Sequence, residues 1–539
     1  MNKVVSVEEM REIEKQADAA GQSYILMMER AGLGISKVIQ EKYSGLGDKN
    51  VIGLVGSGNN GGDALVALSD LQKNGWKAFV VLFKPRLSND PMLARVIELV
   101  VEILDLAQDP SYEKLNNWVS KCSVLLDGVL GTGIHLPLET DLANNLSYIA
   151  LLSPLPQIVA VDCPSGIDCD NGEAAPECLN ADITVTMGAV KQGMLKFPAF
   201  EKIGELLVAD IGLSEGFPPI KSIKRFVVDR KLVKDVLPKR KMDSHKGTYG
   251  TGFIVAGSIN YPGAALLAAK SAYKIGAGLV QLSVPGFLQG ALAGSIPEVT
   301  WLVLPHEMGV ISASAADVVL ANLDKATALL IGPGLGKEET TGEFLKDLIS
   351  RDKLVKKKGG IGFLTGKEEI HEENVILPPL ILDADGLNLL SQIPGWPEIL
   401  PPRSILTPHP GEMSRLTGLD VKEIQLNRLE LVERYAREWN QIVVLKGAVT
   451  IIADPDGNCA FIPVATSALA KAGTGDVLSG ILVGLCAQGV DSFIAAWAGA
   501  WIHAQAGLSA LRIIGHPASV LAGDVCEQIP QVIKQINVE

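Results

Sequence analysis

Hydrophobic and polar positions follow two different periods along this chain. Short apolar runs such as Val51–Val55 and Val124–Gly128 predict buried strands, whereas longer stretches with apolar residues three or four positions apart predict helices. The two kinds of segment alternate from about residue 50 onward, which is typical of βαβ units. Residues 6 to 42 have the spacing of two amphipathic helices that pack onto a sheet. We therefore predict an α/β protein built on parallel sheets.

The length and composition set bounds on this picture. A chain of 539 residues is too long for one hydrophobic core, so we expect two large domains. A segment at 214–223 is rich in proline and basic residues and indicates the boundary, which predicts domains at residues 1–218 and 224–539.

The same features exclude several classes of protein. No apolar run is long enough to cross a membrane and the N-terminus lacks the apolar core of a signal peptide, so we expect a cytoplasmic protein. A net charge of −13 argues against nucleic acid as a partner. The seven cysteines are scattered without a CxxC pair, which favours reduced structural thiols.

Polar residues gather where the predicted strands of the first half end. Gly56-Ser-Gly-Asn-Asn-Gly-Gly-Asp63 lies between a strand and a helix, where a helix N-terminus holds an anion. Asp127 ends the next strand, and Asp162-Cys-Pro-Ser165 follows a third. Because the carboxyl ends of parallel strands meet at one edge, we expect Asn60, Asp127, Asp162 and Ser165 to form a site. Each could instead merely end a strand or turn a corner.

A second glycine-rich stretch organises the other half of the chain. Leu469-Ala-Lys-Ala-Gly-Thr-Gly-Asp-Val-Leu-Ser-Gly480 predicts a turn that leads into a buried helix, whose free N–H groups face an anion. Asp476 then falls in the first helical turn, where its carboxylate can act as a general base or acid. The alternative is a solvated aspartate that only caps the helix.

The motifs of the first half resemble a known family. GSGNNGGD, LLDGVLGTG, VDCPSGID and TMGAVKQGMLKFPA are similar to the epimerase domain of the NAD(P)H-hydrate repair proteins. The resemblance implies a Rossmann-like domain with a parallel central sheet, which interconverts the R and S forms of hydrated NADH or NADPH. It implies that Asp162 is the acid/base residue at the hydrated carbon, and that K⁺ is bound by Asn60, Asp127 and Ser165.

The resemblance also implies a set of substrate contacts. They are Asn59, Asn60, Gly61, Gly62, Asp63, Gly131, Thr132, Gly133, Ile134, His135, Leu136 and Asp162. Two departures from the family pattern stand out. Ala64 occupies a position where glycine is common, and the loop after Gly133 reads IHLPLETDL, without the glycine and the basic residue of the family.

The second half resembles another domain of the same repair system. YPGAA, GPGLG, DADGLN, TPHPGE, LKGAVT and AGTGD are similar to the ADP-dependent NAD(P)H-hydrate dehydratases, which have a ribokinase-like α/β fold. The match spans residues 225–530, and only the insertion at 351–378 has no counterpart. ADP contacts are implied for Lys446, Gly447, Ala448, Val449, Thr450 and Gly475. Contacts to the hydrated dinucleotide are implied for Ala264, Gly336, His409 and Asp476.

The implied chemistry explains why a dehydration consumes a nucleotide. Asp476 would act on the C6 hydroxyl while it is phosphorylated, and phosphate then leaves far more readily than hydroxide. Mg²⁺ would accompany the nucleotide. For Asp383, Asp385 and Asn388, a magnesium or substrate role and plain structural hydrogen bonding both stay open. His409 could equally cap a turn through its ring.

The sequence thus predicts a bifunctional repair enzyme, an epimerase fused to an ADP-dependent dehydratase that releases AMP and phosphate. One alternative is a ribokinase-like hydroxyl kinase that leaves a stable phosphorylated product. Another treats the first half as a ligand-binding module without catalysis. The apolar helices predicted across 477–514 also suggest an interface between subunits, so we expect a homo-oligomer.

Overall fold

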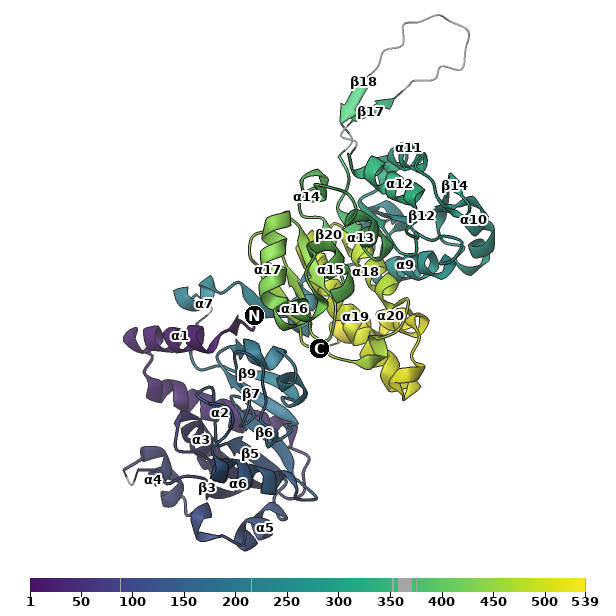
Figure 1. Ribbon diagram of the computed structural model, residues 1–539. Helices are drawn as coiled ribbons and strands as arrows, with labels where there is room; N and C mark the ends of the chain where they lie inside the picture. Colours follow the sequence, from purple (N-terminus) through teal and green to yellow (C-terminus); the bar gives the residue numbers. More distant parts are fainter. Residues whose placement is uncertain (88, 215, 351–352, 357–370, 375, 539) are drawn as a thin grey trace, which may run out of the picture. The chain divides into compact units, whose positions relative to one another are not determined.

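The computed structural model describes residues 1–539 apart from 88, 215, 351–352, 357–370, 375 and 539 (Figure 1). Contacts within the chain divide it into two compact units, Asn2–Val227 and Val228–Glu539 together with Met1. The division follows shortly after the proline-rich segment at 214–223. Each unit is an α/β structure with its own sheet, as the alternating pattern predicted.

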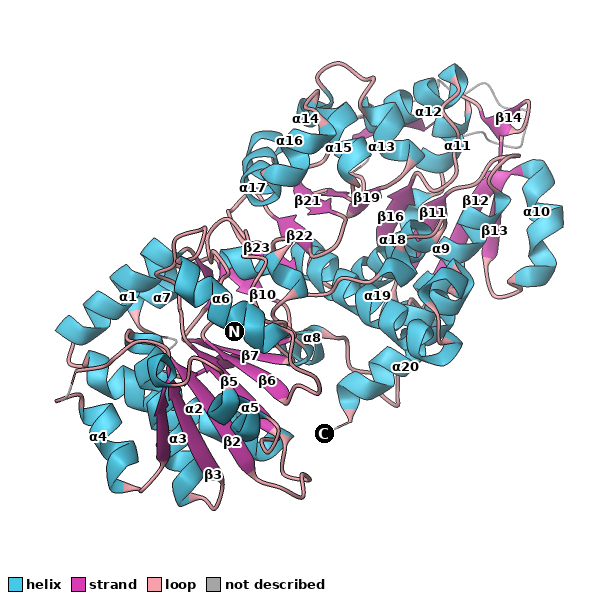
Figure 2. Cartoon of the chain, turned by 60° about the horizontal axis from the view of Figure 1, so that its bottom comes forward, coloured by secondary structure: helices cyan, strands magenta, loops and turns pink. Residues whose placement is uncertain are grey.

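The first unit is built on a seven-stranded sheet with the order β4-β3-β2-β5-β6-β7-β9, in which all neighbours run parallel (Figure 2). Its strands are β2 (Asn50–Val55), β3 (Lys77–Leu82), β4 (Glu102–Asp105), β5 (Val124–Gly128), β6 (Gln157–Val161), β7 (Ile183–Met187) and β9 (Glu205–Ala209). The central strands are buried almost throughout, because helices cover both faces of a parallel sheet.

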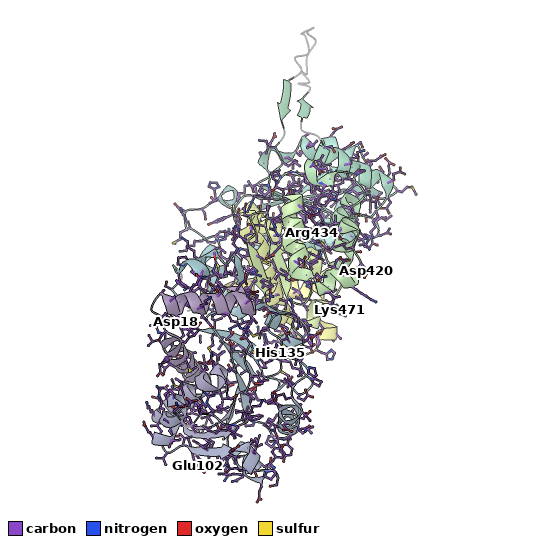
Figure 3. All side chains as sticks on the ribbon, turned by 60° about the vertical axis from the view of Figure 1, so that its left-hand side comes forward. Asp18, Glu102, His135, Asp420, Arg434 and Lys471 are labelled. Carbon is purple, nitrogen blue, oxygen red and sulfur yellow. The ribbon has the colours of Figure 1, made fainter. Side chains whose placement is uncertain are left out.

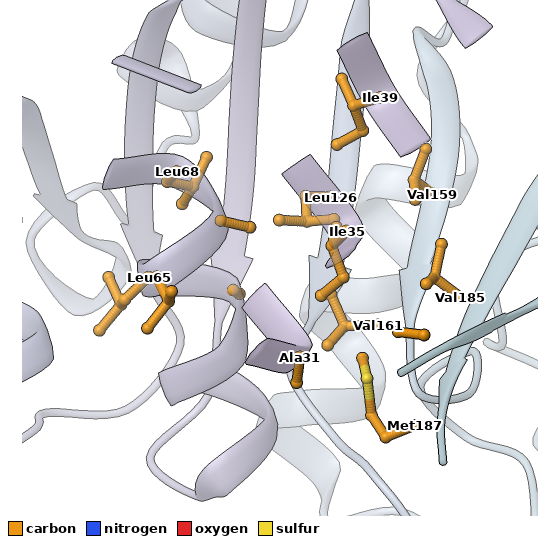
Figure 4. Packing of buried hydrophobic residues seen from close by; sticks show 14 of the residues in the cluster. Ala31, Ile35, Ile39, Leu65, Leu68, Leu126, Val159, Val161, Val185 and Met187 are labelled. Carbon is orange, nitrogen blue, oxygen red and sulfur yellow. The ribbon is translucent and has the colours of Figure 1, made fainter. Parts of the chain in front are cut away.

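Alternate residues of these strands enter two separate cores. The helices around the sheet are α1 (Val7–Ala19), α2 (Tyr24–Lys42), α3 (Asn59–Lys73), α4 (Pro91–Glu98), α5 (Glu113–Val119) and α6 (Thr140–Ala150). Leu126 and Val159 pack with Ile35 of α2 and Leu65 of α3 on one face (Figure 4). Leu125 and its alternating neighbours pack under α5 and α6 on the other face. This period of two explains why one strand supplies both cores.

The second unit is built on a sheet of its own. Within this unit the strands lie in the order β23-β22-β21-β20-β19-β16-β11-β12-β13, and β10 (Arg225–Val227) belongs to the first unit. The strands are β11 (Thr251–Val255), β12 (Leu279–Pro285), β13 (Thr300–Leu304), β16 (Ala328–Ile331), β19 (Leu380–Leu382), β20 (Ile405–Leu406), β21 (Ile442–Leu445), β22 (Thr450–Ala453) and β23 (Cys459–Ile462). Strands β13 to β21 pair in parallel, whereas β22 and β23 are antiparallel.

Helix α18 (Thr474–Ala487) is buried along most of its length. It packs against α9 (Pro262–Ile275), and a Cβ on Gly480 would lie 2.3 Å from the carbonyl oxygen of Ala268. It also packs on α19 (Ser492–Ile514), which contacts α20 (Ala522–Asn537). The apolar stretch at 477–514 therefore lies largely in the core of its own unit, which accounts for its composition without a subunit interface.

The remaining helices of the second unit flank the sheet or connect its strands. They are α8 (Arg230–Val236), α10 (Gly286–Leu292), α11 (Ala315–Leu320), α12 (Glu339–Ser350), α13 (Asp385–Leu390), α14 (Trp396–Ile399), α15 (Pro410–Thr417), α16 (Val421–Leu426) and α17 (Arg428–Trp439). Two short strand pairs lie outside the main sheets.

They are the parallel pair of β1 (Val4–Val5) with β8 (Val190–Lys191) and the antiparallel pair of β14 (His306–Glu307) with β15 (Val310–Ile311). The short helix α7 (Pro218–Ser222) lies near the end of the first unit.

The insertion at 351–378 contains an antiparallel pair, β17 (Lys353–Lys356) and β18 (His371–Asn374). Much of its remainder lies outside the described residues. The seven cysteines form no disulfide. Among the described residues, no helix has the length and apolar character that crossing a bilayer requires.

The contact between α2 and α3 gives a test of this packing. A Cβ on Gly32 would lie 2.4 Å from Cβ of Val66 and 2.8 Å from the carbonyl oxygen of Asp63. We expect Gly32→Ala to force the two helices apart and to lower the free energy of unfolding by about 1–3 kcal/mol. Gly45→Ala is the matched control, since a Cβ there would meet nothing within 4 Å. Urea unfolding of both variants measures the difference, and equal midpoints would contradict the packing.

Candidate active sites

A cavity of about 520 Å³ opens at the carboxyl ends of the central strands in the first unit. Its walls include a part of the predicted substrate contacts. Those that line it are Asn59, Asn60, Asp63, Gly131, Thr132, Gly133 and Asp162. The described lining does not include Gly61, Gly62, Ile134, His135 and Leu136. His135 is exposed on the loop that follows Gly133 (Figure 3).

The backbone of the glycine loop at 56–63 is hydrogen-bonded by an arginine that was not among the residues predicted from the sequence. Arg86 donates to the carbonyl oxygens of Gly56 at 2.5 Å and Gly58 at 3.0 Å, and pairs with Asp90 at 2.6 Å. A Cβ on Gly61 would lie 2.1 Å from the oxygen of Gly56, so that position requires glycine. Helix α3 begins at Asn59 without a side-chain cap, which leaves its first N–H groups for a ligand.

Asp162 is an acid of the cavity whose carboxylate is held by several hydrogen-bond donors. It follows β6 with a positive φ of 63°, and its Oδ1 accepts from Lys191 Nζ at 2.5 Å, Thr186 Oγ1 at 3.0 Å and the backbone N–H of Met187 at 3.1 Å. Its Oδ2 accepts no hydrogen bond from the described part of the chain. One oxygen is therefore fixed by three donors while the other is left for substrate.

Lys191 is fully buried, which is rare for a lysine. Burial by itself lowers the pKa of its ammonium group, but the carboxylate of Asp162 outweighs burial and the net pKa is raised. Lys191 therefore stays charged and serves as the counter-charge of Asp162.

Two more carboxyl groups face this pair. Burial raises the pKa of Asp63 well above its ordinary value, and the negative charges of Asp162 and Glu14 raise it further. The pKa of Glu14 is also raised, mainly by burial, although the charge of Lys191 opposes the shift. The cavity therefore places two carboxyls with raised pKa values beside Asp162, and such a set suits acid/base chemistry.

The three predicted cation ligands lie in one hydrogen-bonded group beside the cavity. Asp127 is fully buried and accepts from Ser165 through the hydroxyl at 2.5 Å and the backbone N–H at 2.8 Å. Asn60 donates to the carbonyl oxygen of Leu130 at 2.7 Å, and the N–H of Leu130 donates to Ser165 Oγ at 2.9 Å. Burial raises the pKa of Asp127, because a lone buried carboxylate lacks a counter-charge.

In the second unit, the AGTGD turn has the predicted form. Gly473 has a φ of 89° and precedes α18, and the hydroxyl of Thr474 donates to the carbonyl oxygens of Leu469 and Lys471, each at 2.9 Å. Asp476 lies in the first turn of the helix. Burial and then the charge of Asp383 raise its pKa to about 7, with Lys446 opposing. Among the described residues, none donates a hydrogen bond to its carboxylate.

Asp383 is the buried centre beneath this turn. Its carboxylate accepts from Lys446 Nζ at 2.8 Å, from Thr407 Oγ1 at 2.6 Å and from the hydroxyl of Ser479. Burial would raise the pKa of Asp383, but Lys446 and the hydroxyl donors lower it overall. Both oxygens are thus occupied, which supports the structural alternative for this residue.

Lys446 links Asp383 to the nucleotide loop predicted at 446–450. Its Nζ lies 3.6 Å from Glu412 Oε2 and 3.6 Å from where a Cβ on Gly475 would stand. Burial raises the pKa of Glu412 to about 7, against the effect of Lys446. Residues 447–449 turn between β21 and β22, with φ of 151° at Gly447 and 57° at Val449.

Arg428, which sequence reasoning missed, supports this loop. It donates to the carbonyl oxygens of Leu445 at 3.0 Å and Val449 at 3.3 Å.

The other predicted dehydratase contacts have partners of their own. His409 caps α15, since its Nδ1 accepts from the N–H groups of Gly411 at 2.9 Å and Glu412 at 3.3 Å, so the capping alternative is realised. Its ring is still half exposed. The N–H of Gly336 donates to Asp385 Oδ2 at 3.0 Å. Ala264 packs on Gly334, where an added Cβ would lie 2.8 Å away.

Comparison with known proteins places the chain in a family. The family model described as NAD(P)H-hydrate dehydratase matches residues 253–531, and the one described as YjeF-related protein N-terminus matches 25–193. The bifunctional NAD(P)H-hydrate repair enzyme Nnr of Moorella thermoacetica is 33% identical over 528 residues, covering 96% of this chain and 93% of the relative. The chain belongs to the bifunctional NAD(P)H-hydrate repair enzymes.

Two further proteins are similar over long stretches. The repair enzyme Nnr of Coxiella burnetii is 33% identical over 499 residues, covering 92% of this chain and 93% of that one. A solved ADP/ATP-dependent NAD(P)H-hydrate dehydratase from Bacillus subtilis is 30% identical, with a TM-score of 0.46 and coverage of 57% of this chain and 98% of that one. The predicted pairing of an epimerase with a dehydratase domain is confirmed by the family.

The buried pair in the repair enzyme's first unit is open to a direct test. We expect Lys191→Met to lower the free energy of unfolding by about 3–5 kcal/mol, because it leaves the Asp162 carboxylate without a counter-charge. The double variant Lys191→Met/Asp162→Asn should regain part of this loss, because the unpaired charge is gone. Urea unfolding of the wild type, both single variants and the double variant measures the coupling. Strictly additive effects would show that the two groups do not interact.

Proposed function

We propose that the two sites carry the two activities of this family separately. The cavity beside Asp162 epimerises hydrated NADH and NADPH within residues 1–218. The group around Asp476 dehydrates the S form within residues 224–539 at the expense of ADP. The observation that supports this division is that each site has a carboxylate oxygen at the end of a strand or the start of a helix that accepts no hydrogen bond from the described residues, Oδ2 of Asp162 and the side chain of Asp476.

Epimerisation requires the C6–O bond to break and form again on the other face of the ring. When the hydroxyl leaves C6 as water, the lone pair of the ring nitrogen forms a C=N bond and C6 becomes planar. Water then adds from either side. Asp162 takes the proton from the adding water and, in reverse, returns it to the departing hydroxyl. The fixed Oδ1 holds the carboxylate in place while Oδ2 exchanges the proton.

The residues of the first site fit the predicted K⁺ ion. Asp127, Ser165 and Asn60 offer a carboxylate, a hydroxyl and an amide oxygen, and the buried Asp127 lacks any cationic partner among the described residues. A bound K⁺ would supply the missing positive charge. These residues would then tie the glycine loop to the loop that begins at Gly131, where an added Cβ would lie 3.3 Å from Asn60.

Dehydration begins with phosphoryl transfer to the C6 hydroxyl. Asp476 removes the hydroxyl proton as the oxygen attacks the β-phosphorus of ADP, and the bond from phosphorus to the AMP oxygen breaks. The free N–H groups at the start of α18 and Lys446 face the negative charge that builds up on the phosphoryl oxygens. Phosphate then leaves C6, a proton leaves C5, and the C5=C6 double bond of NADH or NADPH is restored.

The same cluster fits Mg²⁺ in a limited way. Among the described residues, no three His, Cys, Asp or Glu side chains form a metal cage. Mg²⁺ is commonly held by one or two carboxylates together with phosphate oxygens. Both oxygens of Asp383 already accept hydrogen bonds, so Glu412 and Asp385 are the carboxylates that we propose for this role. A bound Mg²⁺ would neutralise phosphate charge. Residues 446–450 and Gly475 would hold the nucleotide. The homo-oligomer and the cytoplasmic location stay predictions.

Two variants of the full chain test the division of labour. The readout is absorbance of the reduced nicotinamide after hydrated NADH of mixed epimers is incubated with Mg²⁺ and either ADP or ATP. The wild type should recover both epimers. Asp162→Asn should rapidly recover only the share of the S form, and Asp476→Asn should recover none. Full recovery by Asp162→Asn at the wild-type rate would make the first unit a binding module. Accumulation of a stable phosphorylated product would favour the hydroxyl kinase.

The pKa of Asp476 predicts a pH dependence of dehydration. Its value of about 7 leaves the carboxyl half protonated at neutral pH, and only the ionised form can act as a base. We expect kcat/KM for dehydration to rise from pH 6 to pH 8, with a midpoint near 7. Glu412 also titrates near 7, so Glu412→Gln is the control and should keep the midpoint. If kcat/KM of Glu412→Gln no longer changed between pH 6 and pH 8, the pH dependence would belong to Glu412 and not to Asp476.

A further inference from the structure

Cationic side chains around the cavity of the first unit are almost all committed to a partner. Two line the cavity, Arg11 and Lys84. Lys84 pairs with Glu139 at 2.6 Å, and Lys191 behind the wall pairs with Asp162 at 2.5 Å. Arg11 has neither an ion pair nor a hydrogen bond from its guanidinium to any described residue. An exposed arginine without a partner is ordinary on a protein surface.

Arg11 lies on the face of α1 that looks into the cavity. Glu14 follows one turn later, about 4.5 Å along the helix, and lines the same cavity. The Nη2 atom of Arg11 is 3.9 Å from the point where a Cβ on Gly133 would stand. The guanidinium group therefore stands at the end of the loop 131–133, whose first residue contacts Asn60.

Helix α1 is anchored at its start, so Arg11 is carried on a fixed element. Ser6 and Glu9 form a reciprocal cap at the N-terminus of the helix. The N–H of Val7 donates to Asp170 Oδ1 at 2.8 Å, and Glu9 pairs with Arg225. These contacts come from segments far along the chain and hold the first turn in place.

The charges in the cavity determine where a dinucleotide can place its phosphates. The reacting carbon must approach Asp162, where Glu14 and Asp63 add further carboxyl groups. The pyrophosphate is only one ribose away from the nicotinamide ring, so it must lie near this acidic region and needs a cation. The loop after Gly133 carries no lysine or arginine between residues 134 and 142. Among the described residues that line the cavity, Arg11 is the cation without an ion pair, although its charge also acts on Glu14.

We propose that Arg11 binds the pyrophosphate of the hydrated dinucleotide in the first unit. This role rests on the proposed assignment of the cavity to epimerisation. The planar guanidinium offers two parallel N–H donors that match two phosphate oxygens, which a lysine ammonium cannot reproduce. Arg11 is a substrate-binding residue in this scheme and takes no part in proton transfer at C6.

The test compares three variants of the full chain without nucleotide, so that dehydration does not consume either epimer. Chromatography of the two epimers gives kcat and KM for hydrated NADH and for hydrated NADPH. Arg11→Gln should raise KM for both substrates by about tenfold or more and change kcat by no more than about twofold. Arg11→Lys should regain part of the loss. Lys15→Gln is the matched control on the same helix, because Lys15 pairs with Glu12 and does not line the cavity.

Three results would overturn the proposal. They are an unchanged KM in Arg11→Gln, an effect confined to hydrated NADPH, which would place Arg11 at the 2′-phosphate, and a loss of kcat at constant KM. Asp162→Asn is run beside them. If it epimerises at the wild-type rate, the cavity is not the epimerase site and both proposals fail. If Asp162→Asn is inactive while Arg11→Gln has a normal KM, only the role of Arg11 is lost.

Discussion

An aspartate–lysine ion pair with one fully buried partner, at the end of a parallel strand, is the interaction on which both sites depend. Asp162 follows β6 and pairs with Lys191, while Asp383 follows β19 and pairs with Lys446. In each case a threonine hydroxyl, from Thr186 or Thr407, adds a second donor. A carboxylate away from water is costly unless it is paired and hydrogen-bonded, so these donors reduce the cost of placing a carboxylate in each site.

The two ion pairs differ in how many oxygens of the aspartate are left without a hydrogen-bond donor. This difference underlies the proposal of which carboxylate reacts in each unit. Asp162 keeps one oxygen without a donor from the described residues, so it can itself exchange a proton with substrate. Asp383 has both oxygens occupied, because Ser479 takes the second. Its charge instead raises the pKa of Asp476, which is left as the free carboxylate. Under the proposed mechanism, the same kind of pair therefore holds the reacting acid in the first unit, Asp162, and an acid that supports Asp476 in the second.

Two activities on one chain follow from the chemistry of the substrate. Hydration of the nicotinamide ring yields two epimers at C6, whereas a site shaped around one hydroxyl and a phosphoryl donor takes a single epimer. An epimerase supplies the form that the dehydratase accepts. The acidic cavity of the first unit suits the proposed exchange of water at a carbon, and the uncapped N-terminus of α18 in the second suits the proposed phosphoryl transfer.

Patterns along the chain were enough to predict the alternating α/β elements, the glycine turns, and the positions of Asp162 after a buried strand and Asp476 at a helix start. These are local features, in which neighbouring residues decide the conformation. The sequence also suggested a subunit interface at 477–514, although the core of the second unit largely explains that apolar stretch. The motif match extended the substrate loop through Leu136, but of residues 131–136 only Gly131, Thr132 and Gly133 line the cavity.

Tertiary structure alone decided which charges meet. Lys191 lies 29 residues from Asp162, Lys446 lies 63 from Asp383, and Ser479 lies 96 from Asp383. Glu14, Arg86, Arg428 and Arg11 likewise reach their places from other elements. Spacing along the chain carries no signal of such contacts, because they arise only when strands and helices pack. The pKa values follow from that packing, since burial and the charge of a distant partner set them.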